Sequence, residues 1–287
     1  MSAVLTYDPD PKPPRFQLPS GACDSHVHVF GPAERFPYAA NRPYTPVDAP
    51  KEKLFALHRL LGIERCVIVQ STMHGLDNRV VEDAIAAGGG RYLGIALVPI
   101  DAADEELSRL AAAGFRGVRF NFSMHLPSLA APQQLPDFSR RLAAHGLHLQ
   151  VHFDSSLVHT LAAPLSQSAV PVVIDHMGRV DAALGPTHRD FAALHALMQD
   201  PRFHVKVSGA DRVSRGPPYA DGVALARKLL EDFPLRCVWG TDWPHPNHTH
   251  VPDDGQLVDL LQQIAPNPAA RENLLVHNPQ ALYRFPQ

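Results

Sequence analysis

The stretch ACDSHVHVF, residues 22–30, sets two histidines in a run of apolar and β-branched residues. A short run of this kind predicts a buried β-strand. His26 and His28 stand two positions apart, and alternate side chains of a strand point to the same face. We therefore expect both imidazoles on one face of the first strand, at its carboxyl end.

Seven further apolar runs follow the first, and a segment of helical periodicity separates each run from the next. The runs are residues 65–70, 92–98, 117–122, 147–153, 170–177, 203–209 and 237–243. Nearly continuous apolar strands that alternate with single helices predict a parallel sheet covered by helices. Eight such units favour an α/β fold in which the sheet closes into a (β/α)8 TIM-like barrel. Periodicity alone also allows an open doubly wound sheet, although no glycine-rich phosphate loop follows the first strand.

The chain length and the distribution of prolines bound the domain organisation. With 287 residues, of which 45% are hydrophobic, the chain is long enough for a single barrel domain. Residues 1–20 are rich in proline and are expected to form an irregular N-terminal lead, because proline cannot continue regular structure. The barrel is then expected over residues 21–287.

The charge pattern argues against binding to nucleic acid or to an anionic membrane, because the net charge is -3 and the sequence has no basic block. A small molecule is the expected substrate, and the protein is expected to be a monomer or a small homo-oligomer. The first residues lack a signal-peptide pattern and no apolar run approaches the length of a membrane span, which favours the cytoplasm. Cys23, Cys66 and Cys237 stand in strand-like runs and are expected to be buried, reduced thiols.

Polar residues stand at the carboxyl ends of four predicted strands, where barrel enzymes build their active sites. They are His26 and His28 on the first strand, His152 on the fifth, His176 on the sixth and Asp242 on the eighth. An aspartate and several histidines on one rim suit either a divalent metal or acid–base chemistry, and the residues alone leave both open. His248 and His250, in the loop after the eighth strand, remain unassigned.

Three arginines near the same rim form a second group, namely Arg119, Arg179 and Arg212. A guanidinium can hold two carboxylate oxygens at once, which favours an anionic substrate. For Arg119, which lies inside a strand, the alternative is an ion pair with a structural carboxylate. Tyr44 and Asn247 are candidates for further hydrogen bonds to the substrate. His125, after the fourth predicted strand, either lines the pocket or faces water.

Four longer motifs are too specific for a generic barrel pattern: DSHVHVFGP (24–32), FRGVRFNF (115–122), VIDHMGR (173–179) and WGTDWPHPN (239–247). Together they resemble the 2-pyrone-4,6-dicarboxylate lactonases, a family within the amidohydrolase superfamily, and the likeness runs from about residue 12 to the C-terminus. The resemblance implies a carboxylic ester hydrolase, a lactonase. Its substrate would be a cyclic ester bearing carboxylates, opened during the breakdown of lignin-derived aromatics without a required metal.

The same resemblance implies a role for each candidate residue. Asp242 would be the general base that activates water, while His26, His28 and His176 would polarise the carbonyl group of the substrate. The implied substrate contacts are Arg119, Arg179, Arg212, Tyr44 and Asn247.

Two positions depart from the family pattern and bear on the substrate and the metal. His125 stands where the family has a second arginine, and an imidazole is not a permanently charged fork for a carboxylate. His152 stands where the family has a tyrosine, and metal-dependent members of the superfamily often place a ligand histidine on that strand. One divalent ion such as Zn²⁺ is therefore an alternative, with candidate ligands His26, His28, His152, His176 and Asp242.

Three other functions remain compatible with these residues. The first is a related lactonase that acts on a muconolactone or a sugar acid lactone. The second is a metal-dependent decarboxylase of the same superfamily. The third is a barrel without catalysis that serves as a binding protein, although the intact Asp242 and His-x-His motif argue against it.

Overall fold

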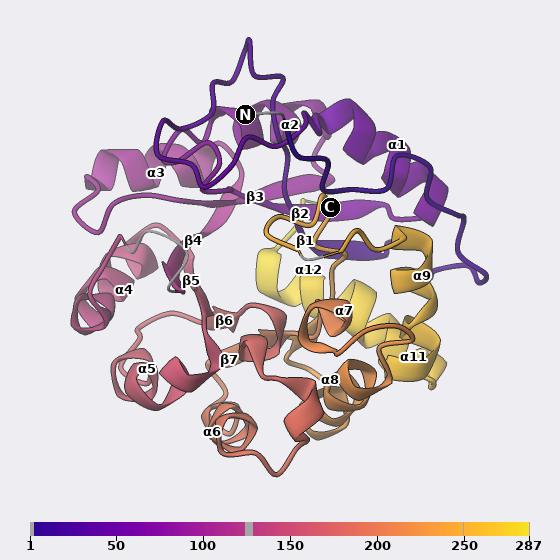
Figure 1. The fold of residues 1–287 in the computed structure, drawn as a ribbon. Helices are drawn as coiled ribbons and strands as arrows, with labels where there is room; N and C mark the ends of the chain where they lie inside the picture. Colours follow the sequence, from indigo (N-terminus) through magenta and orange to yellow (C-terminus); the bar gives the residue numbers. More distant parts are fainter. Residues whose placement is uncertain (1–2, 124–128, 249, 287) are drawn as a thin grey trace.

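Eight parallel strands form one sheet in the order β1 to β8, with helices around its outside (Figure 1). The computed structural model describes residues 3–123, 129–248 and 250–286. The strands are β1 (Cys23–Val27), β2 (Arg65–Val69), β3 (Tyr92–Ala96), β4 (Phe115–Phe122), β5 (His148–Phe153), β6 (Val172–Ile174), β7 (Phe203–Lys206) and β8 (Cys237–Val238). The predicted (β/α)8 barrel is confirmed.

Backbone hydrogen bonds between β1 and the residues after β8 close the sheet on itself. The amide of Ser25 donates to the carbonyl of Trp239 at 2.8 Å, and the amide of Asp242 donates to the carbonyl of His26 at 2.8 Å. Gly240 lies at this seam, and a Cβ atom added to it would stand 2.5 Å from the His26 amide nitrogen. The two segments that carry the candidate aspartate and histidines are therefore held directly against each other.

Several strands are shorter than the apolar runs that predicted them. The run 170–177 contains β6 (Val172–Ile174), and the run 237–243 contains only β8 (Cys237–Val238). Most of the missing residues stand at the carboxyl end of each run, where the chain leaves the sheet to enter a loop. The polar residues predicted at these strand ends consequently lie in loops at one end of the barrel, just beyond the ends of the strands.

The helices of the barrel follow the strands in alternation and cover the outer face of the sheet (Figure 1). The α-helices are α1 (Lys51–Leu61), α2 (Arg79–Ala87), α3 (Asp104–Ala112), α4 (Leu135–Ala144), α5 (Val158–Leu165), α6 (Arg189–Leu197), α7 (Ala210–Val213), α8 (Ala220–Asp232), α9 (Asp254–Asp259), α10 (Leu261–Ile264), α11 (Pro268–Glu272) and α12 (Asn278–Tyr283). Short helical segments are η1 (Pro132–Gln134), η2 (Ser155–Leu157), η3 (His176–Arg179), η4 (Ala182–Leu184) and η5 (Asn273–His277).

Helix α1 shows how the sequence pattern produces this arrangement. Its buried residues include Leu54, Leu57 and Leu61, which share one face because they are spaced by three and four positions. The helix ends at Gly62, whose φ of 77° is a left-handed conformation that glycine adopts without a steric penalty. A buried face and a glycine stop together set the length of this helix.

The hydrophobic core has two parts, one outside the barrel and one inside it. The larger cluster fills the space between sheet and helices, whereas the smaller cluster contains Val67, Val69 and Ile95 together with Tyr283 near the C-terminus. Tyr283 is fully buried on α12, and its ring lies 5.6 Å from that of His148, a residue of β5. The C-terminal helix thus packs against the interior cluster, and polar side chains are left to fill the rest of the barrel.

A register irregularity in β1 places the first candidate histidine. The pairing of β1 with β2 shifts between Asp24 and Val27. Ser25 contacts Cys23 of the interior cluster at 3.6 Å, and the next residue, His26, contacts Lys206 inside the barrel at 3.2 Å. Strict alternation would send neighbouring side chains to opposite faces, so the shift is what brings both into the barrel.

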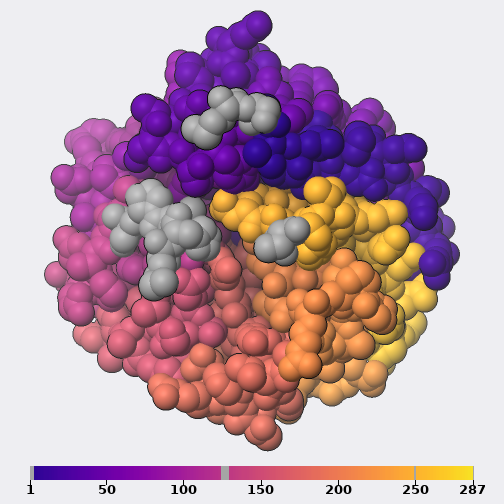
Figure 2. All heavy atoms as spheres, viewed as in Figure 1, coloured from indigo at the N-terminus to yellow at the C-terminus, as the bar shows by residue number. Residues whose placement is uncertain are grey.

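The N-terminal lead packs on the barrel of its own chain. Tyr7 is buried with its ring 5.5 Å from that of Trp243, and the amide of Arg15 donates to the Asp259 carboxylate at 2.7 Å. Figure 2 shows the indigo N-terminal segment lying against the yellow and orange C-terminal third of the chain. Within the described residues, no helix combines the length and apolarity needed to cross a bilayer.

Candidate active site

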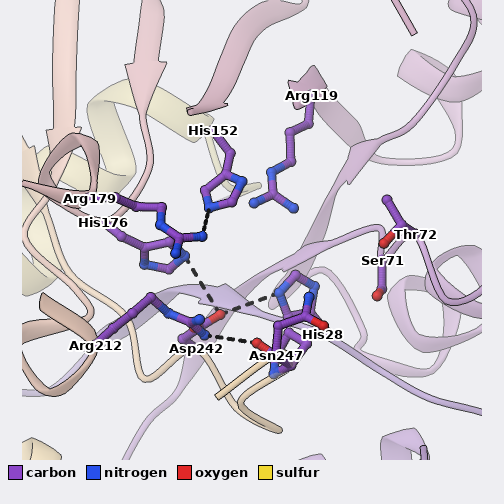
Figure 3. A pocket seen from close by; sticks show the side chains of 11 residues that line it. His28, Ser71, Thr72, Arg119, His152, His176, Arg179, Arg212, Asp242 and Asn247 are labelled. Carbon is purple, nitrogen blue, oxygen red and sulfur yellow. Dashed lines mark hydrogen bonds and ion pairs between the residues drawn. The ribbon is translucent and has the colours of Figure 1, made fainter. Parts of the chain in front are cut away.

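A small pocket opens among the loops that follow the carboxyl ends of the strands (Figure 3). Its lining residues are His28, Ser71, Thr72, Arg119, His152, His176, Arg179, Arg212, Asp242, Pro246 and Asn247. They come from β4 and β5 and from the segments after β1, β2, β6, β7 and β8. This is the end of a (β/α)8 barrel at which active sites occur.

One carboxylate oxygen lies at the centre of the candidate histidines. Asp242 Oδ1 is 3.3 Å from His28 Nε2, 3.6 Å from His26 Nε2 and 3.7 Å from His176 Nε2. Asp242 and all three histidines are buried, and Oδ1 makes no hydrogen bond with the described residues. A buried anionic oxygen without a hydrogen bond is costly, so this atom is expected to meet a proton or a cation when the site works.

The other oxygen of this carboxylate is engaged by an arginine. Arg212 donates to Asp242 Oδ2 through Nε at 3.1 Å and also through Nη2. Burial raises the pKa of Asp242, but Arg212 and the three histidines together outweigh it, and the pKa lies well below the usual range. Asp242 is therefore ionised at neutral pH.

Hydrogen bonds at Nδ1 orient the imidazoles. His28 Nδ1 is 2.7 Å from the carbonyl oxygen of Val69, which can only accept, so Nδ1 carries the proton and Nε2 of the neutral ring is a lone pair. His176 Nδ1 is 3.0 Å from Ser208 Oγ, a hydroxyl that can donate or accept. His176 can thus present either a donor or a lone pair at Nε2, whereas neutral His28 presents a lone pair.

These atoms fit a divalent metal. His26, His28 and Asp242 each offer one ligand atom, and the three atoms lie within 4.8 Å of one another. The His28 Nε2 lone pair and the Asp242 Oδ1 charge, 3.3 Å apart, repel each other unless a cation or a proton lies between them. His26 Nε2 is likewise buried and makes no hydrogen bond to any residue that the structure describes. Two imidazoles and one carboxylate are a ligand set typical of zinc.

The other two candidate ligands are placed differently. His176 Nε2 approaches Asp242 Oδ1 but does not belong to the compact group of three. His152 Nε2 accepts from Arg179 Nη1 at 3.5 Å, as Figure 3 shows, so this nitrogen is directed at an arginine. The pKa of His152 lies well below its ordinary value, because the ring is buried and Arg119 is nearby.

Arg119 of β4 and Arg179 of η3 both line the pocket. Arg119 donates from Nε to Asp175 Oδ2 at 2.8 Å and also lines the pocket, with its guanidinium turned toward it in Figure 3. The two interpretations of Arg119 therefore hold together: it pairs with a structural carboxylate and still faces the pocket. Burial and the neighbouring Arg212 lower the pKa of Arg179.

A buried polar layer lies directly beneath the histidines, and sequence reasoning missed most of it. Lys206 of β7 is fully buried, donates to Gln150 Oε1 at 3.0 Å, and lies 3.3 Å from Asp175 Oδ1 and 3.2 Å from His26 Nδ1. Burial followed by the charge of Lys206 lowers the pKa of His26 to about 3, so this ring is neutral. The sequence did contain one sign of this layer, because Lys206 is a charged residue within an apolar strand.

Unusual backbone conformations gather in the two loops of the site. Six of the eight non-glycine residues with positive φ in the described chain lie at positions 176–179 and 242–247. Among them are His176 at 47° and Asp242 at 67°. Such conformations cost roughly 1–3 kcal/mol each and persist where the surrounding structure enforces them. The side chains of His176 and Asp242 are thus aimed by a constrained backbone.

The remaining candidates lie at the edge of the pocket. Asn247 lines it, and its backbone amide donates to the hydroxyl of Tyr44 at 3.2 Å. Tyr44 itself does not line the pocket but supports the loop that carries Asn247. His125 lies outside the described residues.

Comparison with known proteins adds to this geometry. A family model described as Amidohydrolase matches residues 23–285. The chain belongs to the amidohydrolase family. The match covers the whole barrel of this amidohydrolase, and the superfamily predicted from the four motifs is confirmed.

Two relatives and one solved structure resemble this amidohydrolase over nearly its full length. A 2-pyrone-4,6-dicarboxylate hydrolase from Comamonas testosteroni is 42% identical, over 97% of this chain and 95% of the relative. A 4-sulfomuconolactone hydrolase from Hydrogenophaga intermedia is 42% identical, over 94% of this chain and 91% of the relative. An apo crystal structure from Agrobacterium tumefaciens has a TM-score of 0.84 at 30% identity, over 95% of this chain and 99% of that one.

Proposed function

We propose that this amidohydrolase is a lactonase, a carboxylic ester hydrolase that opens a carboxylate-bearing lactone such as 2-pyrone-4,6-dicarboxylate in the catabolism of lignin-derived aromatics. The observation that carries the proposal is the pocket itself. An ionised aspartate stands among three imidazoles, and three arginines line the same cavity. The names of the two relatives, both lactone hydrolases with anionic substrates, support it.

In the proposed reaction, Asp242 takes a proton from water as the water oxygen attacks the lactone carbonyl carbon. The resulting tetrahedral oxyanion collapses with cleavage of the ring C–O bond, and the ring oxygen receives the proton that Asp242 took from water, which returns Asp242 to its ionised form. Asp242 is suited to the first step because it is ionised at neutral pH and its Oδ1 makes no hydrogen bond with the described residues. Arg212 holds the other oxygen and thereby sets the orientation of the carboxylate.

The histidines are proposed to divide the task of stabilising the oxyanion. His176 can donate a hydrogen bond from Nε2, because the Ser208 hydroxyl can donate to its Nδ1. The Val69 carbonyl fixes a proton on Nδ1 of His28, so Nε2 of this ring is free to donate its lone pair to a cation. His26, His28 and Asp242 would hold a divalent ion. When bound, such an ion supplies Lewis acidity toward the lactone carbonyl.

The decisive assay uses a panel of lactones before and after treatment with a chelator. The panel contains 2-pyrone-4,6-dicarboxylate, 4-sulfomuconolactone, a muconolactone and a sugar acid lactone. We expect hydrolysis of the dicarboxylate, loss of activity on chelation and recovery on addition of Zn²⁺. Activity that survives chelation would assign the chemistry to the side chains alone. Release of CO₂ without hydrolysis of any lactone would contradict the proposal and favour a decarboxylase.

Replacing Arg179 with glutamine is expected to raise KM for the dicarboxylate by about 10–100-fold while kcat changes little. A hydrogen bond between charged groups contributes roughly 1.5–3 kcal/mol, and the amide retains the shape but not the charge. Steady-state kinetics of the variant measure both constants. Arg189→Gln is the control, because Arg189 is exposed on α6 and does not line the pocket. An unchanged KM in the Arg179 variant would exclude this residue as a substrate contact.

We also propose a cytoplasmic location and action as a monomer or small homo-oligomer. Cys23, Cys66 and Cys237 are buried and free, which suits a reducing compartment.

A further inference from the structure

A second group of donor atoms lies beside the pocket, between α7 and the loop after β8. Asp211 Oδ2 is 3.4 Å from His248 Nε2 and 3.6 Å from His250 Nε2. Asp211 is only 3% exposed, and all three atoms are buried without a hydrogen bond among the described residues. Burying a polar atom without a hydrogen bond or a ligand is costly. Three such atoms that lie close together therefore indicate a bound ligand that contacts all three.

We propose that Asp211, His248 and His250 form a divalent-metal site of the zinc type, separate from the group at Asp242. Tetrahedral zinc with ligand bonds of about 2.1 Å places its donor atoms about 3.4 Å apart. The separations of 3.4 Å and 3.6 Å match that spacing. They exceed the roughly 2.7–3.2 Å of an ordinary N–H···O hydrogen bond. Two imidazoles and one carboxylate leave a fourth position for water.

Neighbouring rings hold the two imidazoles in place, and the nearby arginine is paired with other oxygens. The His250 ring is stacked on Tyr219 with centroids 5.9 Å apart, and the His248 ring stands edge-on to His245 at 5.5 Å. Both imidazoles are therefore held in place before an ion arrives. The nearby Arg212 guanidinium is hydrogen-bonded to Asp242 Oδ2 and to the carbonyl of Pro246, so its charge is already balanced by other oxygens.

The position of the site indicates what the ion would do. Asp211 lies on α7, which also carries Arg212, while His248 and His250 follow Asn247 in the loop after β8. Arg212 and Asn247 both line the substrate pocket. An ion held by both segments fastens them together. His248 Nε2 lies 3.9 Å from Asp242 Oδ2, so this fastening reaches the edge of the reaction centre.

The test counts bound zinc by mass spectrometry after removal of all metal and dialysis against Zn²⁺. The parent is the His26→Gln/His28→Gln variant, in which the group at Asp242 has lost two ligands. We expect the parent to retain one equivalent of zinc and His250→Gln in the parent background to lose it. His277→Gln, at an exposed histidine outside the group, is the matched control and should retain it. A parent that binds no zinc, or a His250 variant that binds as much as the parent, would overturn the proposal.

Wild-type crystals grown with Zn²⁺ provide a second measurement that depends on no variant. We expect an anomalous difference peak at the zinc edge within about 2.1 Å of Asp211 Oδ2, His248 Nε2 and His250 Nε2. Absence of a peak there, with zinc in the crystal, would refute the site. Neither measurement uses lactonase activity, so failure of the proposed reaction and failure of this metal site are distinguished.

Discussion

Replacing Asp242 with asparagine is expected to lower kcat for lactone hydrolysis by roughly 10²–10⁴-fold, the range that a general base contributes. Asparagine has nearly the same shape, but its amide cannot take a proton from water. The pKa of Asp242 lies well below the usual range despite its burial, so the native side chain is in the basic form at neutral pH. Single-turnover and steady-state kinetics with saturating lactone measure the loss.

The matched control is Asp190→Asn. Asp190 is also buried, but it lies on α6, pairs with His159 and Ser155, and does not line the pocket. Its replacement should leave kcat within about twofold. Far-ultraviolet circular dichroism of both variants should match the parent spectrum, because the barrel strands do not depend on either carboxylate. Undiminished turnover in the Asp242 variant would remove this residue from the role of base.

Replacing Asp175 with asparagine should lower the free energy of unfolding by about 3–5 kcal/mol, the cost of breaking a buried ion pair by removing one partner. Asp175 is fully buried and accepts from Arg119 at 2.8 Å and from Gln150 at 3.1 Å, with the Lys206 ammonium 3.3 Å away. Without the Asp175 charge, the buried cations Arg119 and Lys206 would lose the carboxylate that lies between them. Equilibrium denaturation in urea measures the difference.

Two further variants separate this cause from a general loss of packing. Adding Lys206→Met to the Asp175 variant should recover part of the lost stability, because it removes one of the unpaired cations. Asp137→Asn is the surface control: its side chain is 86% exposed beside Arg140, and the expected change is below about 0.5 kcal/mol. A change of that small size at Asp175 would show that the buried layer does not depend on its carboxylate.

The sequence predicted the barrel and the gathering of its rim residues, since both depend on local pattern. Spacing by two positions put His26 and His28 on one face, and the strand ends located His176 and Asp242. The predicted strands extend beyond the observed ones. The run 237–243 was predicted as a strand, but β8 ends at Val238, because the apolar run continues into the loop. An apolar residue in a buried loop and one in a strand look alike to periodicity.

Other parts of the site could not be predicted because they depend on contacts between distant residues. The register shift in β1 is a property of its pairing with β2. The proton position on His28 follows from the carbonyl of Val69, which lies 41 residues further along the chain. Lys206 could have been noticed as a charge in an apolar strand, but its partners Gln150 and Asp175 come from two other strand segments. Nor does sequence reveal that His248 and His250 meet Asp211.

The candidate catalytic residues and two of the pocket arginines come from different parts of the barrel. Asp242, His26 and His28 belong to two segments joined by backbone hydrogen bonds, so the residues that we propose to act on the ester lie where the barrel closes. Arg119 and Arg179, which we propose as contacts to the anionic substrate, come from β4 and the segment after β6. A substitution at Arg119 or Arg179 therefore changes the charge of the pocket wall without changing the backbone hydrogen bonds that hold Asp242 against His26.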